Sequence, residues 1–285
     1  MNSVRPLGRS DATALQDLRR WESPFAALMR NKSLVWELTK REVLGRYRGA
    51  SFGMAWSVIS PFLMLSVYAF AFGTVLKSRW PHQTGGEHSY AVILFVGLIV
   101  HGFFAECVSR ASTLIVGNSN FVKRVVFPLD VLPWPMIFSA LFHALLNAVV
   151  LVVLMLVLEH RLHPTLLFLP LILAPLVLFT LGVSWLLASL GVYFRDISQV
   201  MPVIVTAMLF LSSAIVPVSI LPPPIQTLFY LNPLTFFIDQ ARLVVLAGGL
   251  PNWTALAFAT VGGVLVAWLG HAWFMATRRG FADVL

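Results

Sequence analysis

The chain has 285 residues, of which 58% are hydrophobic and 11% charged, and its mean hydropathy is +0.83. A water-soluble fold of this size could not bury so much apolar surface, so the composition excludes a soluble protein and indicates one whose solvent is lipid. The net charge of +8 would suit a nucleic-acid-binding protein, but the basic residues concentrate beside apolar segments, where they set membrane topology. We therefore expect an all-α integral membrane protein that binds no nucleic acid.

Three segments divide the chain by composition. Residues 1–33 are polar and lack the apolar core of a secretory signal, so we expect an uncleaved cytoplasmic tail. Residues 34–279 contain the long apolar segments and predict one transmembrane domain, followed by a short cytoplasmic tail at residues 280–285. The lone cysteine, Cys107, excludes an internal disulfide and offers no cysteine cluster for a metal.

A helix is predicted over residues 34–48, immediately before the first apolar segment. Its apolar side chains fall on two sides rather than in one stripe, which favours a helix lying between lipid and protein. Its basic residues directly precede a membrane span and predict a cytoplasmic location. Two acid-first pairs at a spacing of four residues should stabilise it, namely Glu37 with Arg41 and Glu42 with Arg46.

Six apolar segments are long enough to cross a bilayer. They cover residues 52–76, 90–108, 136–158, 165–193, 197–220 and 253–275. If both termini are cytoplasmic, sixteen lysines and arginines lie inside and four outside, as the positive-inside rule requires. We therefore predict six transmembrane helices with both termini in the cytoplasm.

The inner loop after the second span, residues 117–135, predicts a short helix through Val126 capped by Asn118 or Ser119. Such a helix, fixed between two spans, is a good handle for a soluble partner. An ordinary turn with topology-setting basic residues explains the loop as well, and the spacing alone favours the turn. Three prolines keep the loop separate from the next span: Pro128, Pro133 and Pro135.

The segment after the fifth span, residues 221–252, is apolar overall but interrupted by prolines at 222–224 and at 233. The interruptions leave helical pieces of roughly 6 and 13 residues, which are too short to cross a bilayer. A re-entrant or interfacial pair of helices on the outer side is therefore expected. Asp239 and Arg242 are three residues apart and can pair, which lowers the cost of placing them near lipid.

The sequence contains no motif for converting energy. No GxxxxGK[ST] loop is present, and no inner segment could house a catalytic domain, so we expect no ATP hydrolysis by this chain. Charges lie near the ends of the predicted spans, which disfavours ion coupling and voltage sensing. There is no HExxH motif, and His101, His143 and His271 lie on separate spans, so packed or pore-facing histidines are expected rather than metal ligands. Such a protein either conducts passively or takes energy from a partner.

Aromatic residues are frequent in the first and fifth spans. Sugar rings present C–H faces that stack on aromatic rings, so a passage lined with aromatic side chains would suit a glycan. For any single residue, packing or contact with lipid is the commoner role. The candidates are Trp56, Phe62, Tyr68, Phe72 and Phe210.

Four segments taken together resemble the ABC-2 type membrane subunits of polysaccharide exporters, a family that includes permeases for O-antigen, capsule and teichoic acid. The segments are LTKREVLGRYRGASFGMAWSVISP, NSNFVKRVVFPLDVLP, FRDISQVMP and LFYLNPLTFFIDQARLVVLAG. The resemblance covers residues 34–279. It implies a transport subunit of the bacterial inner membrane rather than an enzyme. This subunit would move a lipid-linked glycan, and the resemblance favours O-antigen over capsular polysaccharide.

The resemblance further implies a homodimer that pairs with two copies of a separate ATPase, which would hold ATP and Mg²⁺, while this chain would hold no cofactor or metal. The first and fifth spans of both copies would line a channel. An interface helix beside the ATPase would include Glu37, Lys40, Arg41, Arg46 and Tyr47. A coupling helix docked in the ATPase would include Asn118, Asn120, Phe121, Val122, Lys123, Arg124, Phe127 and Pro128. Periplasmic gate helices would include Pro223, Pro224, Phe229, Tyr230, Asn232, Pro233, Asp239 and Arg242.

Three alternatives stay open. An ATP-driven exporter of drugs or lipids would share the six spans and the partner ATPase. A passive channel or a structural membrane protein would need no partner. An intramembrane glycosyl or acyl transferase would need a catalytic group facing its substrate, and His143 is the candidate.

Overall fold

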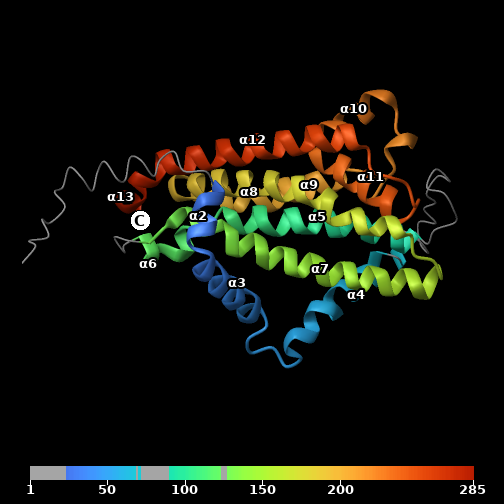
Figure 1. Ribbon diagram of the computed structural model, residues 1–285, viewed down its shortest axis with the longest axis horizontal. Coiled ribbons are helices and arrows are strands. Elements are labelled where there is room, and N and C mark those ends of the chain that lie inside the picture. The colour runs from blue at the N-terminus through green and yellow to red at the C-terminus, as the bar shows by residue number, and fades with distance from the viewer. Residues whose placement is uncertain (1–23, 69, 72–89, 123–126) are drawn as a thin grey trace, which may run out of the picture.

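The computed structural model describes residues 24–285 except 69, 72–89 and 123–126, and its described part is helical without strands. Long helices run side by side in an elongated bundle, with shorter helices at its ends and along one side (Figure 1). This all-helical architecture agrees with the fold class that the composition predicts. The long helices are α5 (Tyr90–Ala111), α7 (Pro133–Leu158), α8 (Leu169–Tyr193) and α12 (Trp253–Thr277).

Four segments of the described chain are long and apolar enough to cross a membrane, which confirms a multi-pass protein. They correspond to the predicted second, third, fourth and sixth spans. Two other apolar helices are shorter, α4 (Trp56–Tyr68) and α9 (Ile197–Phe210). The predicted first span continues beyond α4 into residues outside the described part, so the count of six spans stays a prediction.

The predicted fifth span is too long at its outer end, because α9 ends at Phe210 rather than continuing to residue 220. Fourteen residues of helix extend about 21 Å, well short of a hydrocarbon core of about 30 Å. The Ser212 hydroxyl turns back to donate to the Leu209 carbonyl at 2.8 Å and accepts the Ala214 N–H at 3.2 Å. Pro217 is then extended before η8 (Val218–Ile220), since proline cannot donate the N–H that a continuing helix needs.

The third span begins earlier than predicted. We expected the prolines to delay it to Met136, but α7 starts at Pro133, directly after η6 (Leu129–Val131). Pro133 and Pro135 both lie in the first turn of α7, where a helical N–H has no intrahelical acceptor and its absence costs nothing.

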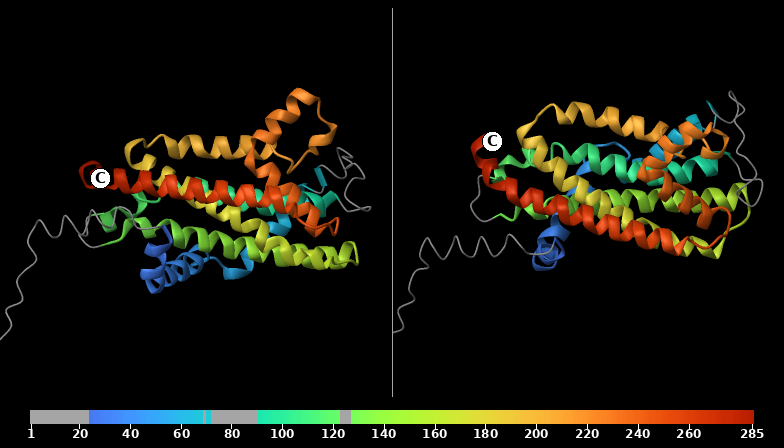
Figure 2. Two further views of the ribbon diagram at one scale, coloured as in Figure 1. Left: turned by 45° about the horizontal axis from the view of Figure 1, so that its top comes forward. Right: turned by 90° about the horizontal axis from the view of Figure 1, so that it is seen from above.

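Helices α8 and α12 form the closest helix pair of the bundle and run side by side in both views of Figure 2. A Cβ atom on Gly270 would lie 2.1 Å from the Gly182 carbonyl oxygen, and one on Gly182 would lie 2.3 Å from the Val266 carbonyl oxygen. Glycine at these positions allows the backbones to approach, which is how helices gain packing energy within lipid.

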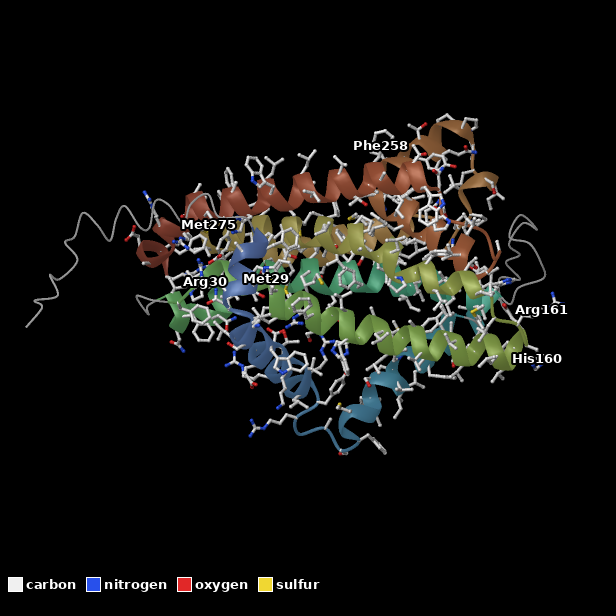
Figure 3. All side chains as sticks on the ribbon, in the orientation of Figure 1. Met29, Arg30, His160, Arg161, Phe258 and Met275 are labelled. Atoms are coloured by element: carbon white, nitrogen blue, oxygen red, sulfur yellow. The ribbon has the colours of Figure 1, made fainter. Side chains whose placement is uncertain are left out.

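Both segments that the sequence assigned to tails contain helices packed on the bundle. Phe25 of α2 (Pro24–Arg30) lies 5.7 Å from Trp134 between ring centroids. Phe281 of α13 (Phe281–Val284) is fully buried and lies 5.4 Å from Phe274. Figure 3 shows Arg30 and Met275 toward one end of the bundle and Arg161 at the other.

Candidate functional site

A single-turn helix, α6 (Ser119–Val122), lies in the loop between α5 and α7 and follows η5 (Val116–Asn118). The ring of Phe121 stacks on Phe127 at 4.2 Å between centroids and 7° between planes. The predicted helix was to reach Val126, but its last four residues, including Lys123 and Arg124, lie outside the described part.

The loop is anchored on its inward side and polar on its outward side. Phe121, Val122 and Phe127 pack against the hydrophobic core, whereas Asn120 is exposed. The sequence predicted a cap from Asn118 or Ser119; the Asn118 amide nitrogen donates backward to the Leu114 carbonyl at 2.8 Å. The described residues on both sides of this loop are therefore anchored on the core.

Helix α3 (Lys32–Arg46) confirms the helix predicted before the first span. Val35, Leu38 and Thr39 are buried, and α3 packs against α7. Its predicted interface residues Glu37, Lys40 and Arg41 are exposed. One side of α3 therefore packs on the bundle, and its charged side is exposed.

Salt bridges connect α3 to α5. Arg46 binds Glu106, Glu106 also accepts from Arg110 at 3.2 Å, and Arg110 binds Glu42. Glu42 and Arg46 therefore pair with α5 rather than with each other, so the predicted intrahelical pair is wrong. Side chains of α5 reach these groups because of the way the helices pack. The residue spacing within α3 does not predict these partners.

Beside these salt bridges is a cavity of about 410 Å³ that the sequence did not predict. Tyr47 and His143 meet in its wall, with the Tyr47 hydroxyl 3.1 Å from His143 Nδ1. Burial raises the pKa of Tyr47, so its hydroxyl stays protonated at neutral pH. The remaining lining residues are Arg46, Ala50, Trp56, Ser57, Ser60, Pro61, Glu106 and Asn147.

Two short helices follow η8, as the positions of the prolines predict. They are α10 (Pro223–Leu231), which begins with Pro223 and Pro224, and α11 (Pro233–Val245). Between them, the Asn232 amide donates to the carbonyls of Met208 at 2.8 Å and Leu211 at 3.0 Å, at the broken end of α9. Its side-chain oxygen accepts the Leu234 N–H at 3.1 Å and caps α11.

Arg242 of α11 is only 3% exposed. Its Nε donates to the Ile93 carbonyl at 3.1 Å, its Nη2 to the Ala214 carbonyl at 2.7 Å, and its Nη1 to the Ser213 carbonyl. Asp239 interacts with it electrostatically. The sequence placed this arginine near lipid; in the structure it lies inside the protein and joins α11, α5 and the segment after α9.

The other two predicted gate residues differ in exposure. Phe229 is buried and Tyr230 is 63% exposed, although they are neighbours on α10. Adjacent helical residues point about 100° apart, so one helix can pack on the protein with one side and present an aromatic ring with the other.

The predicted channel aromatics are not gathered by one chain. Trp56, Phe62 and Phe210 are exposed, while the Tyr68 side chain and Phe72 lie outside the described part. Helix α4 packs on α7 and α5, whereas α9 packs on α5 and α8. The exposed rings of α4 and α9 therefore lie on helices with largely different packing partners among the described residues.

The histidines on separate spans have separate environments. His101 Nε2 lies 3.0 Å from the Val205 carbonyl, and His271 Nε2 lies 3.9 Å from Asp130. Arg278 approaches the same buried carboxylate at 3.9 Å. Within the described ranges, no group of three or more His, Cys, Asp or Glu residues is arranged to hold a metal ion.

These features define a multi-pass helical membrane protein: within the described residues it has four apolar helices of spanning length, an anchored loop helix between α5 and α7, and a short helix pair after α9. The chain belongs to the ABC-2 type transporter family, whose model matches residues 33–246.

Named relatives align over most of the chain. The O-antigen export system permease protein RfbA of Klebsiella pneumoniae is 26% identical over 87% of this chain and 93% of the relative. RfbA of Myxococcus xanthus is 24% identical over 90% of this chain and 96% of the relative. The polysialic acid transport protein KpsM of Escherichia coli is 24% identical over 85% of this chain and 92% of the relative.

Proposed function

We propose that this chain is the membrane-spanning subunit of an ATP-driven exporter that moves a lipid-linked polysaccharide out across the bacterial inner membrane. The favoured polysaccharide is O-antigen. The observation that carries the proposal is the end-to-end alignment with permeases named for O-antigen and polysialic acid transport. An exporter of drugs or lipids is the alternative within the family, and the alignment with polysaccharide permeases over 85–90% of this chain favours a glycan.

The power comes from a separate ATPase in this proposal. Two copies of this chain bind two copies of the ATPase, which carries ATP and Mg²⁺, and the loop with α6 docks in it. The anchoring of Phe121 and Phe127 supports this role, because a handle transmits force only if its base is rigid. Helix α3 transmits the same motion to α5 through its salt bridges.

The outer helix pair acts as the gate, and the glycan passes between the α4 and α9 faces of the two copies. Support comes from the exposure of Trp56, Phe62 and Phe210, which leaves these rings available to line a passage in the dimer. Tyr230 faces outward from α10 and is positioned to meet the chain as it leaves.

The docking role predicts that reversing the charges of Lys123 and Arg124 weakens ATPase binding. In a pull-down from detergent extracts, we expect the Lys123→Glu/Arg124→Glu variant to recover less ATPase than the unmodified chain, by a factor of about ten or more. The reason is that two attractive contacts become repulsive. Arg161→Glu is the matched control, since Arg161 is exposed at the opposite end of the bundle (Figure 3).

Unchanged ATPase recovery with the double variant would overturn the docking role. The transport role has its own assay: vesicles containing both subunits should accumulate lipid-linked O-antigen only with ATP. Uphill accumulation by this chain alone, without an ATPase, would overturn the proposed function itself.

A further inference from the structure

The cavity next to the α3–α5 salt bridges includes Arg46 and Tyr47 of the interface helix and Trp56 of the proposed passage, but the coupling, channel and gate roles make no use of its neutral polar groups Ser57, Ser60 and Asn147. It lies where the end of α3, the start of α4 and the sides of α5 and α7 meet, and α3 and α4 diverge there on one side of the bundle (Figure 1). Seven of its ten lining residues carry a polar side chain. In a protein whose exposed surface is otherwise largely apolar, such a pocket indicates a polar ligand.

The charges in the pocket are one of each sign. Arg46 and Glu106 are joined by two hydrogen bonds, one of them 3.2 Å long, and their side chains are 36% and 19% exposed. A ligand with only negative charge would be attracted by Arg46 and repelled by Glu106. A zwitterion satisfies both, with its anion on Arg46 and its cation on Glu106.

Neutral donors and acceptors surround this pair. Ser57, Ser60 and Asn147 line the pocket, and the Tyr47 hydroxyl is oriented there by His143. These groups can complete the hydrogen bonds of phosphate and ester oxygens without adding charge.

The depth of the pocket along the helices fits the membrane interface. Glu106 lies five residues before the end of α5, about 8 Å along the axis, and His143 lies ten residues after the start of α7, about 15 Å. On the predicted topology these are the inner ends. The polar layer on each side of the hydrocarbon core is roughly 5–8 Å deep, so Glu106 lies near the boundary of the headgroups and His143 several Å further toward the acyl chains.

Apolar surface continues from the pocket toward the outer side. On α4, Leu63, Met64 and Val67 are exposed on the side of the helix that carries Ser60. Acyl chains leaving the pocket would lie against this side of α4.

We propose that this pocket binds the headgroup of a zwitterionic membrane phospholipid of the phosphoethanolamine class. Its phosphate lies on Arg46, its ammonium group on Glu106, and its acyl chains lie on α4. The lipid fills the space between α3 and the bundle and seats α3 at the membrane surface. The site stands independently of the proposed cargo.

The direct test is lipid retention by the purified full-length chain. The protein is mixed in detergent with equal amounts of phosphatidylethanolamine and phosphatidylglycerol that have identical acyl chains, and bound lipid is counted by native mass spectrometry. We expect phosphatidylethanolamine to be retained roughly two- to fivefold over phosphatidylglycerol, the ratio that one partly exposed ion pair supplies. Equal retention of the two lipids would overturn the proposal.

Two variants locate the site. Glu106→Gln leaves Arg46 unopposed, so the preference should shift toward the anionic phosphatidylglycerol. Ser60→Leu places a larger side chain in the cavity and should abolish selective retention, whereas Ser66→Leu, on the same helix but outside the cavity, should leave it unchanged. An identical loss in both serine variants would show that the lipid binds elsewhere.

A polyprenyl phosphate, added as a third competitor, separates a structural lipid from a cargo carrier. We expect it not to displace phosphatidylethanolamine at equal concentration, because its added negative charge would face Glu106. Displacement that is lost in Ser60→Leu would assign the pocket to the carrier of the exported glycan and overturn the present assignment.

Discussion

The two ends of this protein are held together by opposite means. At the end predicted to be outer, Arg242 and Asn232 donate to backbone carbonyls where α9 breaks, and both are at most 9% exposed. At the end predicted to be inner, side chains of α3 and α5 bind each other, and Arg46 and Arg110 are 36% and 33% exposed. Both ends use arginine, but one arginine replaces missing helical hydrogen bonds and the others pair with carboxylates near water.

The difference follows from the solvent at each end. A carbonyl freed by a helix break inside the membrane finds no water, so its donor must come from the protein and its loss is costly. A partly exposed ion pair competes with water and contributes little. The outer end is therefore expected to be rigid and the inner contacts exchangeable, as a gate support and a coupling interface would need.

The largest effect is expected from removing the buried guanidinium. Arg242→Met keeps the volume but leaves the carbonyls of Ile93, Ser213 and Ala214 without these donors. We expect the free energy of unfolding, measured by denaturant titration in micelles, to fall by about 3–5 kcal/mol. Arg161→Met, at an exposed arginine, should change it by less than about 0.5 kcal/mol. If both variants were equally stable, the outer end would not depend on this cation.

A second comparison separates two contributions of Asn232: the hydrogen bonds that its amide donates to two carbonyls, and the hydrogen bond by which it caps α11. Asn232 and Asn252 both cap a following helix, but Asn232 also donates to Met208 and Leu211. Asn252→Ala should cost about 1 kcal/mol, the usual value of a cap. Asn232→Ala should cost about 2–3 kcal/mol in the same titration, because two carbonyls at the broken end of α9 also lose their donor. Equal losses would mean that only capping matters.

The smallest effect is expected at the inner end. Glu42→Gln removes the salt bridge to Arg110 and should lower the free energy of unfolding by less than about 1 kcal/mol. The loss should shrink as salt is raised, since ions screen exposed charges. Glu37→Gln, at an exposed position of the same helix, is the control. A loss of several kcal/mol that persists in high salt would show that both ends are held equally firmly.

Predictions based on local chemistry were the successful ones. The prolines before α10 and α11 gave two helices too short to span, and the charged segment before the first span gave α3. Four of the predicted spans have counterparts of spanning length. These features depend on residues close together in the chain, where proline geometry, helical spacing and hydropathy act.

Predictions about pairing were less successful. Glu42 and Arg46 were expected to bind each other, but each binds a side chain of α5 instead. Arg242 was placed near lipid and is buried. In each case the spacing allowed the predicted contact, but a better partner became available only after the helices packed.

The sequence alone determined the solvent of this protein, the number of helix interruptions after α9 and the positions of its basic residues, because hydropathy, proline and charge act locally. Only the tertiary structure decided where α9 ends, which carbonyls Arg242 binds and that a polar cavity lies beside α3. The physical reason is distance along the chain: Arg242 and Ile93 are 149 residues apart, and Tyr47 and His143 are 96 apart. No local pattern specifies such partners, which meet only when the helices pack together.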